Sequence, residues 1–331
     1  MRTITYRDAL REAMRDEMRR DERVFILGED VVGYGGTYAV TKDLDKEFTE
    51  KRVLDTPLAE EVIAATAIGA ALGGLRPIAE IMTMNFSLLA SDQIVNEAAK
   101  ARYMFGGQPK VPVVFRMPGG GGAQRGAQHS QSLESWFAHI PGLKVVMPAT
   151  PYDAKGMLKS AVRDDDPILF IEHELLYGVK GEVPEEGEEY TVPLDRGIVR
   201  REGRDVSLIT FSRMVHICLQ AAEELAKEGI DAEVVDMRSI RPLDLDLALD
   251  SVKKTNRAVV VEEGWKYFGT GQGIAALIYE YGFDWMDAPI QHVSGADVPM
   301  PYAKNLERAA LPVRNDVIKA VRAIVPQKVR A

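Results

Sequence analysis

The stretch Asp55–Glu61 reads Asp-Thr-Pro-Leu-Ala-Glu-Glu and leads directly into an Ala-, Gly- and Ile-rich run that ends at Leu75. Thr56 is a good N-cap residue and proline is favoured at the first helical position, so the pattern predicts a helix over Pro57–Gly73. A capping box would place its acid three residues after the cap, whereas Glu60 lies one residue later. Capping therefore does not explain Glu60. It is either a carboxylate kept for chemistry or a charge that the helix dipole favours.

The same predicted helix carries a stripe of residues with almost no side chains. Ala65, Gly69 and Gly73 recur every four residues and share one face. Each glycine inside a helix costs about 1 kcal/mol relative to alanine. Close approach of another backbone would offset that cost, and the approaching element could belong to this chain or to a partner.

The bulk composition excludes several classes of protein. The chain has 331 residues, of which 46% are hydrophobic and 27% are charged, which is typical of a globular protein with room for two domains. Its net charge of −9 argues against a nucleic-acid groove, because binding phosphates requires clustered lysine and arginine. The single cysteine, Cys218, excludes an internal disulfide and a four-cysteine metal site, and we expect it to be buried.

Membrane and export signals are missing from the sequence. No apolar run reaches the roughly 18 residues of a membrane-spanning helix. The first residues also lack the apolar centre of a signal peptide. We therefore expect a cytoplasmic protein that binds neither membranes nor nucleic acid.

Short β-rich runs alternate with helical patterns, which is typical of an α/β fold with mostly parallel sheets. In the first half the predicted strands are Val24–Gly28, Pro77–Met82, Val111–Arg116, Leu143–Met147 and Pro167–Ile171. The predicted helices there are Thr5–Arg20, Pro57–Gly73, Leu88–Tyr103, Gln131–His139 and Pro151–Arg163.

The alternation stops at the acidic segment Gly181–Glu189, which indicates the start of an exposed linker. Beyond it the predicted strands are Asp205–Thr210, Ala232–Asp236, Ala258–Glu262 and Ile290–Val293, and the predicted helices are Met214–Glu228, Asp244–Lys254, Gly269–Gly282 and Val313–Ile324. We therefore predict two α/β domains, at residues 1–185 and 201–331, joined by a linker at 186–200.

Two glycine-rich segments invite a binding role. Met117–Gln131 follows a predicted buried strand and holds five glycines between residues 119 and 126, so it can pass close to a ligand or another chain. It lacks the Gly-Lys-Ser/Thr of a phosphate-binding P-loop. Within it, His129 has a structural and a catalytic interpretation, and both stay open. The second segment, Gly269–Gly273, opens a helix, but its spacing departs from the dinucleotide-binding fingerprint.

Six segments together resemble a known family. They are Gly28–Val31, Asp55–Glu60, Gly74–Glu80, Ala127–Gln131, Pro141–Val146 and Asp297–Tyr302, in this order. The chain is similar, from about residue 3 to about residue 325, to the β subunits of the thiamine-diphosphate-dependent first component of 2-oxo acid dehydrogenase complexes. The resemblance implies a pyrimidine-binding domain followed by a transketolase C-terminal-like domain.

The resemblance also implies partners and a shared cofactor. Family members are α2β2 heterotetramers in which the α subunit holds the diphosphate and Mg²⁺ through a Gly-Asp-Gly motif. The β subunit supplies the aminopyrimidine half of the site. This sequence has no Gly-Asp-Gly, which fits a chain that carries half a cofactor site. A lipoyl acyltransferase core is the further partner that the resemblance implies.

Residue roles follow from the positions that match the family's motifs. Glu60 aligns with the glutamate that hydrogen-bonds the pyrimidine ring nitrogen and promotes deprotonation of the cofactor. Glu29, Leu58 and Phe86 match cofactor-binding positions, with Phe86 stacking on the pyrimidine. His129 matches a histidine at the active-site entrance that serves substrate and acyl transfer. A K⁺ site of some relatives would fall on Val113, Ala161, Val162, Asp164 and Asp166, although relatives carry Asn at the last position.

Among family activities, Phe86 and Gln128–Gln131 favour pyruvate as the substrate, with oxidative decarboxylation and acetyl transfer to a lipoyl group. The enzyme would be a pyruvate dehydrogenase (acetyl-transferring) that is active only with an α subunit. Acetoin and branched-chain 2-oxo acids are the alternative substrates. An alternative of another class is a non-catalytic subunit that completes the tetramer and docks on the acyltransferase core.

Overall fold

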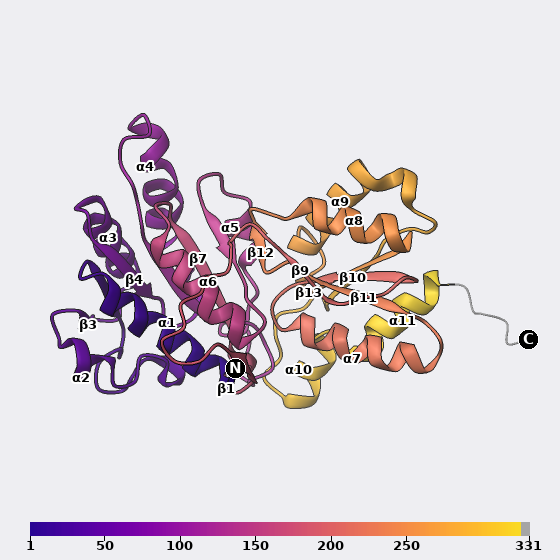
Figure 1. The fold of residues 1–331 in the computed structure, drawn as a ribbon, viewed down its shortest axis with the longest axis horizontal. Helices are drawn as coiled ribbons and strands as arrows, with labels where there is room; N and C mark the ends of the chain where they lie inside the picture. Colours follow the sequence, from indigo (N-terminus) through magenta and orange to yellow (C-terminus); the bar gives the residue numbers. More distant parts are fainter. Residues whose placement is uncertain (326–331) are drawn as a thin grey trace, which may run out of the picture. The chain divides into compact units, whose positions relative to one another are not determined.

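The computed structural model describes residues 1–325, and packing divides the chain into two compact units (Figure 1). The first unit comprises Met1–Gly119 and Trp136–Leu194, and the second comprises Gly120–Ser135 and the chain from Asp195 onward. The segment Gly120–Ser135 thus folds with the second unit, although it interrupts the first in the sequence. The sequence-based limits at 185 and 201 stay predictions, and residues 326–331 of the predicted second domain lie outside the described residues.

A parallel sheet of buried strands forms the centre of the first unit. Its strand order is β6-β7-β5-β4-β2-β3, and neighbouring strands in this order run parallel. The strands are β2 (Val24–Gly28), β3 (Val53–Asp55), β4 (Arg76–Glu80), β5 (Val114–Gly119), β6 (Lys144–Val146) and β7 (Ile168–His173). Their nearly continuous apolar character suits a parallel sheet that is buried on both faces. A separate antiparallel pair, β1 (Arg2–Thr5) with β8 (Lys180–Val183), was not predicted.

The helices before residue 195 are α1 (Tyr6–Arg20), α2 (Leu44–Phe48), α3 (Glu60–Leu72), α4 (Ala99–Met104), α5 (Glu134–Ala138) and α6 (Pro151–Arg163). Two predictions of helix length were wrong. The segment predicted as Leu88–Tyr103 consists of a 3-10 turn at Met84–Leu88, a π-helical segment at Gln93–Ala98 and α4. The helix predicted at Gln131–His139 shortens to α5, because the glycine-rich loop before it takes up the first residues.

Helix α3 begins three residues later than predicted, at Glu60 rather than Pro57, and Thr56 is not its cap. The reason lies in the strand before it. The Thr56 N–H donates to the Gly28 carbonyl at 3.0 Å and so extends the pairing of β2 with β3. The Asp55 carboxylate accepts the Val32 N–H at 2.8 Å and holds the end of β3. The chain therefore stays extended until Glu60 becomes the first residue of the helix.

The small-residue face of α3 is exposed in this chain. Apart from the backbone of α3 itself, no heavy atom of the described residues lies within 4 Å of a Cβ built on Gly69. At Gly73 the nearest atoms are two carbonyl oxygens of the same helix. Val62 and Leu72 on this helix are also exposed. The described part of the chain thus offers no element that approaches these glycines closely.

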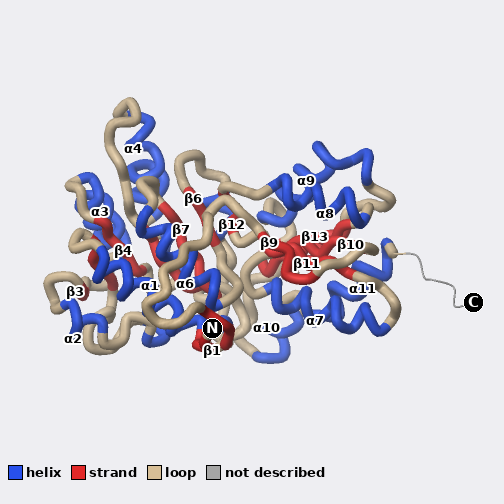
Figure 2. Tube along the Cα trace, in the orientation of Figure 1, coloured by secondary structure: helices blue, strands red, loops and turns tan. Residues whose placement is uncertain are grey.

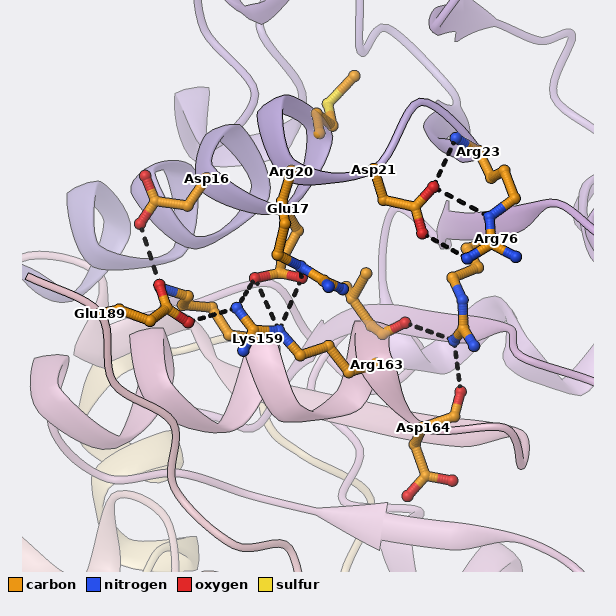
Figure 3. A network of polar contacts seen from close by, with 12 residues as sticks. Asp16, Glu17, Arg20, Asp21, Arg23, Arg76, Lys159, Arg163, Asp164 and Glu189 are labelled. Carbon is orange, nitrogen blue, oxygen red and sulfur yellow. Dashed lines mark hydrogen bonds and ion pairs between the residues drawn. The ribbon is translucent and has the colours of Figure 1, made fainter. Parts of the chain in front are cut away.

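Helices α1 and α6 pack together through ion pairs as well as apolar contacts (Figure 3). Thr5 caps α1 as predicted, since its Oγ1 accepts the Asp8 N–H at 3.1 Å. Glu17, whose side chain is 1% exposed, accepts from Arg20 Nε at 2.8 Å and from Arg163 Nε at 3.0 Å. Lys159 is fully buried and its Nζ lies 2.5 Å from the carboxylate of Glu189. The network ties α1 to α6 and to the segment that leaves the first unit.

The second unit is a smaller α/β layer structure. Its sheet has the order β14-β13-β10-β11-β9, with β9 antiparallel to β11 and the other pairs parallel. Figure 2 shows α8 and α9 on one face of this sheet and α7 and α11 on the other. The strands of this sheet are β9 (Ile198–Arg201), β10 (Val206–Thr210), β11 (Ala232–Asp236), β13 (Ala258–Trp265) and β14 (Gln291–Gly295), and the short strand β12 (Ser239–Arg241) is not part of it. The helices are α7 (Met214–Lys227), α8 (Leu245–Thr255), α9 (Thr270–Gly282), α10 (Lys304–Ala310) and α11 (Arg314–Ile324).

The predicted class of two α/β domains with mostly parallel sheets is confirmed by these two units. Cys218 lies in the core of the second unit, as expected, and burial raises the pKa of its thiol. None of the helices described in residues 1–325 combines the length and apolar character needed to cross a bilayer.

The α1–α6 network predicts the effect of a single substitution. Glu17→Gln removes the charge that Arg20 and Arg163 share in a mostly buried position, so we expect the free energy of unfolding to fall by about 1–3 kcal/mol. Urea unfolding followed by circular dichroism measures the change. Glu22→Gln removes the same charge from an exposed position and serves as the control. Equal stability of the two variants would contradict the role of the network.

Candidate active site

Three carboxylates gather at the carboxyl edge of the first sheet. Glu29 directly follows β2, Glu80 ends β4, and Glu60 begins the helix that follows β3. The strand order reverses at β2, because β3 lies on one side of it and β4 on the other. In open parallel sheets, ligands bind outside the carboxyl ends of the strands at such a reversal. The fold therefore places these acids where a ligand site is expected.

Glu29 is buried without a partner. Its side chain is 3% exposed, and neither carboxylate oxygen has a hydrogen-bond partner among the described residues. Burial, and then the nearby carboxylate of Glu60, raises the pKa of Glu29 to about 7. Leaving a buried polar group unpaired is costly, so this carboxyl group is poised to meet a donor from outside the chain.

Glu60 is 6% exposed and stands at the first position of α3, where the helix dipole favours its negative charge. Leu58, on the extended segment before the helix, is 79% exposed. Phe86 lies partly buried on the 3-10 turn that follows β4. The first unit thus contains Glu29, Glu60 and Phe86 on the segments that follow three neighbouring strands, and it carries Leu58 at its surface.

Arg116 provides the positive charge beneath this edge. Its side chain is buried on β5 and donates to the carboxylate of Glu80. It also donates twice to the carboxylate of Glu172, from Nε at 2.5 Å and from Nη2 at 3.0 Å. The Tyr177 hydroxyl donates to the same Glu172 carboxylate at 2.5 Å. Burial raises the pKa of Glu80, whose other oxygen accepts the Thr37 N–H at 3.3 Å. Through the Thr37 N–H, the network therefore anchors the turn at residues 33–37, which follows Glu29.

No role was predicted from the sequence for Arg116, Glu80 or Glu172. A signal was present, because each is a charged residue at or near the end of an otherwise apolar strand. Charged side chains are rarely buried unless they are paired. Their alignment at one sheet edge depends on the strand order, which the sequence did not reveal.

The pair of Glu29 and Glu60 fits the aminopyrimidine of thiamine diphosphate. A buried carboxyl group that lacks a partner suits a ligand with amino and ring-nitrogen groups. A second buried carboxylate nearby can share a proton with such a ring nitrogen. An aromatic side chain such as Phe86 suits the face of a flat heterocycle. Among residues 1–325, no group of three or more His, Cys, Asp or Glu side chains is arranged to hold a metal ion.

His129 belongs to the second unit, whereas Glu29, Glu60 and Phe86 belong to the first. It is half-buried, and its backbone N–H donates to the Gly126 carbonyl at 3.3 Å. It therefore follows the glycine-rich loop by a single turn. The neighbouring Ser130 is buried, and its hydroxyl has no hydrogen-bond partner among the described residues.

The predicted K⁺ positions already face a cation of the chain. Arg76 Nη1 donates to the carbonyl oxygens of Val162 and Asp164, at 2.9 Å each. Figure 3 shows the contact between Arg76 and Asp164. The Val113 carbonyl accepts from Ile168. The predicted set was Val113, Ala161, Val162, Asp164 and Asp166. A fixed guanidinium charge at two of these carbonyls disfavours a second cation there. The K⁺ site stays a prediction, which the potassium experiment below tests.

Asp166 is likewise paired within the chain. Its carboxylate contacts Arg102, and one oxygen lies 3.2 Å from Lys144 Nζ. Burial alone would raise the pKa of Asp166, but Arg102 and Lys144 outweigh burial and lower it. The chain's own cations therefore neutralise the acid at this predicted position.

Glu29→Gln tests the burial of the unpaired carboxyl group. Between its ordinary pKa of 4.5 and its folded pKa of about 7, the folded chain holds a proton that the unfolded chain has lost. Stability therefore falls as the pH rises through this window. We expect Glu29→Gln to have a higher Tm than wild type at pH 8 and the same Tm at pH 4, below both pKa values, measured by scanning calorimetry. Glu50→Gln, an exposed control, should change neither, and an equal gap at both pH values would contradict the shift.

The contacts of Arg76 allow us to predict how potassium affects the Tm of the protein. Because a guanidinium already serves the carbonyls of Val162 and Asp164, we expect the same Tm in KCl and in choline chloride of equal ionic strength. Arg76→Met should lower Tm, and KCl should then restore more of the loss than choline chloride. A wild-type Tm that rises in KCl alone would show that a bound cation is needed.

Comparison with known proteins identifies the domains. Residues 2–180 match the family model described as transketolase, pyrimidine binding domain. Residues 195–317 match the one described as transketolase, C-terminal domain. A solved structure titled split gene transketolase, inactive beta4 tetramer, superposes with a TM-score of 0.80 over 98% of this chain and 99% of that one. Its sequence identity is 24%, so it supports the fold alone.

Curated relatives match over nearly the full length. The pyruvate dehydrogenase E1 component subunit beta of Rickettsia felis is 51% identical over 321 residues, which cover 97% of this chain and 98% of the relative. The mitochondrial protein of the same name from Homo sapiens is 48% identical over 322 residues, which cover 96% and 90%. With two matching domain models and relatives of about half identity, the chain belongs to the transketolase-like family of pyruvate dehydrogenase E1 component β subunits.

Proposed function

We propose that this chain is the β subunit of a thiamine-diphosphate-dependent pyruvate dehydrogenase and that it supplies the pyrimidine half of the cofactor site. The observation that carries the proposal is the buried carboxyl group of Glu29, unpaired among the described residues and close to Glu60. It lies at the strand ends of a domain whose family model is described as pyrimidine binding. The names of the full-length relatives support the activity.

The residues of this chain have separable tasks. Glu60 would share a proton with the pyrimidine ring nitrogen, and Glu29 would hydrogen-bond the same end of the ring. Phe86 would stack on the ring, and the exposed Leu58 would cover it. When bound, thiamine diphosphate supplies the nucleophilic carbon and the electron sink for decarboxylation of a 2-oxo acid. His129 would serve substrate binding and the transfer of the acyl group to a lipoyl group.

An α subunit would complete the site in an α2β2 heterotetramer and would hold the diphosphate and Mg²⁺. The exposed small-residue face of α3 supports a partner, because Gly69 and Gly73 permit a backbone to approach closely. Exposed apolar side chains on the same helix, Val62 and Leu72, support it further. The acyltransferase core and a cytoplasmic location stay predictions.

Pyruvate is the proposed substrate. Phe86 and the Gln-His-Ser-Gln sequence at 128–131 favour it over branched-chain 2-oxo acids and acetoin, and relatives named for pyruvate are about half identical. A purely architectural subunit is the alternative of another class. The Glu29 carboxyl group, which has no hydrogen-bond partner among the described residues, favours a catalytic subunit over an architectural one. A buried acid without a partner destabilises a purely structural protein.

Glu60→Gln in the reconstituted α2β2 enzyme tests the catalytic role. Gln keeps the size of the side chain but cannot take up the proton, so we expect pyruvate-dependent ferricyanide reduction to fall at least about 100-fold. Glu50→Gln, an exposed carboxylate outside α3, is the matched control and should retain activity. Gel filtration verifies that each variant assembles.

The outcome separates the alternatives. Turnover of Glu60→Gln within a few-fold of wild type would leave the architectural interpretation standing and overturn the catalytic one. A wild-type enzyme that assembles but turns over acetoin or 3-methyl-2-oxobutanoate faster than pyruvate would keep the cofactor role and replace the substrate.

A further inference from the structure

The glycine-rich loop that precedes His129 is held by carboxylates of the second unit. A loop with five glycines between residues 119 and 126 has little conformational preference of its own. Its conformation must therefore come from contacts. Three of its backbone N–H groups, those of Gly121, Gly122 and Gln124, donate to carboxylate oxygens.

Glu307 on α10 makes two of these bonds. Its side chain is 2% exposed, and its Oε1 accepts the Gly122 N–H at 3.0 Å and the Gln124 N–H at 2.9 Å. Gly122 and Gln124 have φ of 103° and 57°, so the loop backbone curls around the carboxylate oxygen. Backbone N–H groups in such turns form anion-binding concavities. The loop therefore binds an anion that belongs to the chain itself.

Glu263 on β13 makes the third bond. Its Oε1 accepts the Gly121 N–H at 2.7 Å, while its Oε2 lies 2.8 Å from Nη1 of Arg213. Arg213 thus neutralises and orients this carboxylate. Hydrogen bonds to ionised groups are about twice as strong as those between neutral groups, so two carboxylates can determine the path of a loop that lacks side chains.

Apolar side chains close the other side of the loop. A Cβ on Gly121 would lie 3.0 Å from Met300 and 3.1 Å from Leu311, and a Cβ on Gly126 would lie 3.1 Å from the ring of Tyr302. Gly126 also has a φ of 76°. Met300 and Tyr302 belong to the Asp297–Tyr302 motif, for which the sequence analysis found no role. Two residues of this motif, Met300 and Tyr302, therefore pack against the loop.

The loop fixes the start of the turn that carries His129. The His129 N–H donates to the carbonyl of Gly126, the residue packed against Tyr302. Displacing the loop therefore displaces the backbone of His129. All of these residues lie within the second unit.

We propose that Glu307, assisted by Glu263, is a positioning residue for His129: it captures the backbone N–H groups of the glycine-rich loop and so sets the place of the histidine. The proposal rests on the function proposed above for His129. Glu307 itself touches neither substrate nor cofactor in this account. Its contribution reaches the reaction only through the loop.

A double-mutant cycle in the reconstituted α2β2 enzyme tests the proposal. Glu307→Ala removes the acceptor, and we expect acetyl transfer to an isolated lipoyl domain to fall about tenfold or more, because small displacements of a reacting group are costly. Glu307→Gln keeps an acceptor oxygen and should restore most of the rate. In a His129→Ala background, Glu307→Ala should have no further effect. Glu280→Ala, an exposed carboxylate on α9, is the matched control and should behave as wild type.

Hydrogen exchange of the loop supplies a readout that does not depend on activity. Peptides covering residues 119–131 should exchange faster in Glu307→Ala than in wild type or Glu280→Ala, with Glu307→Gln in between. Unchanged exchange in Glu307→Ala would overturn the proposal, as would an additive loss of acetyl transfer in the double variant. If Glu307→Ala fails to assemble, Glu307→Asp, whose carboxylate is one methylene shorter and so withdraws from the Gly122 and Gln124 N–H groups, replaces it in the same comparisons.

The two proposals fail in different ways. Full acetyl transfer by His129→Ala would remove the proposed function of this histidine, and with it the positioning role of Glu307. Faster loop exchange in Glu307→Ala would then establish Glu307 as a structural anchor only. The positioning role alone would be overturned if His129→Ala lost acetyl transfer as expected while Glu307→Ala changed neither acetyl transfer nor hydrogen exchange.

Discussion

The buried guanidinium of Arg116 is the charge on which the carboxyl edge of the first sheet depends. An isolated carboxylate inside a protein is costly, and two of them on β4 and β7, the strands on either side of β5, would repel each other. Arg116 contacts both Glu80 and Glu172 and makes their burial tolerable. Glu80 then holds the turn at Thr37, close in sequence to Glu29. Removing the cation would leave buried acids without compensation, which is more damaging than losing an ordinary surface ion pair.

The two units treat buried acids differently. In the first, Glu29 has no hydrogen-bond partner among the described residues, and burial raises its pKa to about 7. In the second, one oxygen of Glu263 and one of Glu307 accept backbone N–H groups of a loop, and the other oxygen of Glu263 pairs with Arg213. A buried acid without hydrogen-bond partners is a candidate for reaction or ligand binding, whereas an acid whose oxygens accept hydrogen bonds within the chain stabilises the structure. Burial alone does not distinguish the two cases, and the count of hydrogen-bond donors does.

Glycine serves opposite purposes in the two units. On α3, Gly69 and Gly73 leave an exposed face without side chains, which costs helix stability unless another backbone packs there. In the loop before His129, Gly121 and Gly126 are required because Met300, Leu311 and Tyr302 already fill the space of a Cβ. The first set faces outward from this chain, and the second lies inside it. The amino-acid composition does not distinguish these two sets of glycines.

Periodicity and residue type determined the α/β class and most strand positions, since local patterns such as those of β2 and β11 depend on short segments, and the capping pattern singled out Glu60. The resemblance to a family assigned roles to Glu60, Glu29, Phe86 and His129, but periodicity could not. The start of α3 was mispredicted because Thr56 pairs with Gly28, a contact that capping rules do not include. Strand order, the Arg116 network, the cation at the predicted K⁺ carbonyls and the anchoring of the glycine-rich loop depend on residues far apart in the chain. Only the tertiary structure could decide them, because hydrogen bonds across long sequence separations leave no local pattern.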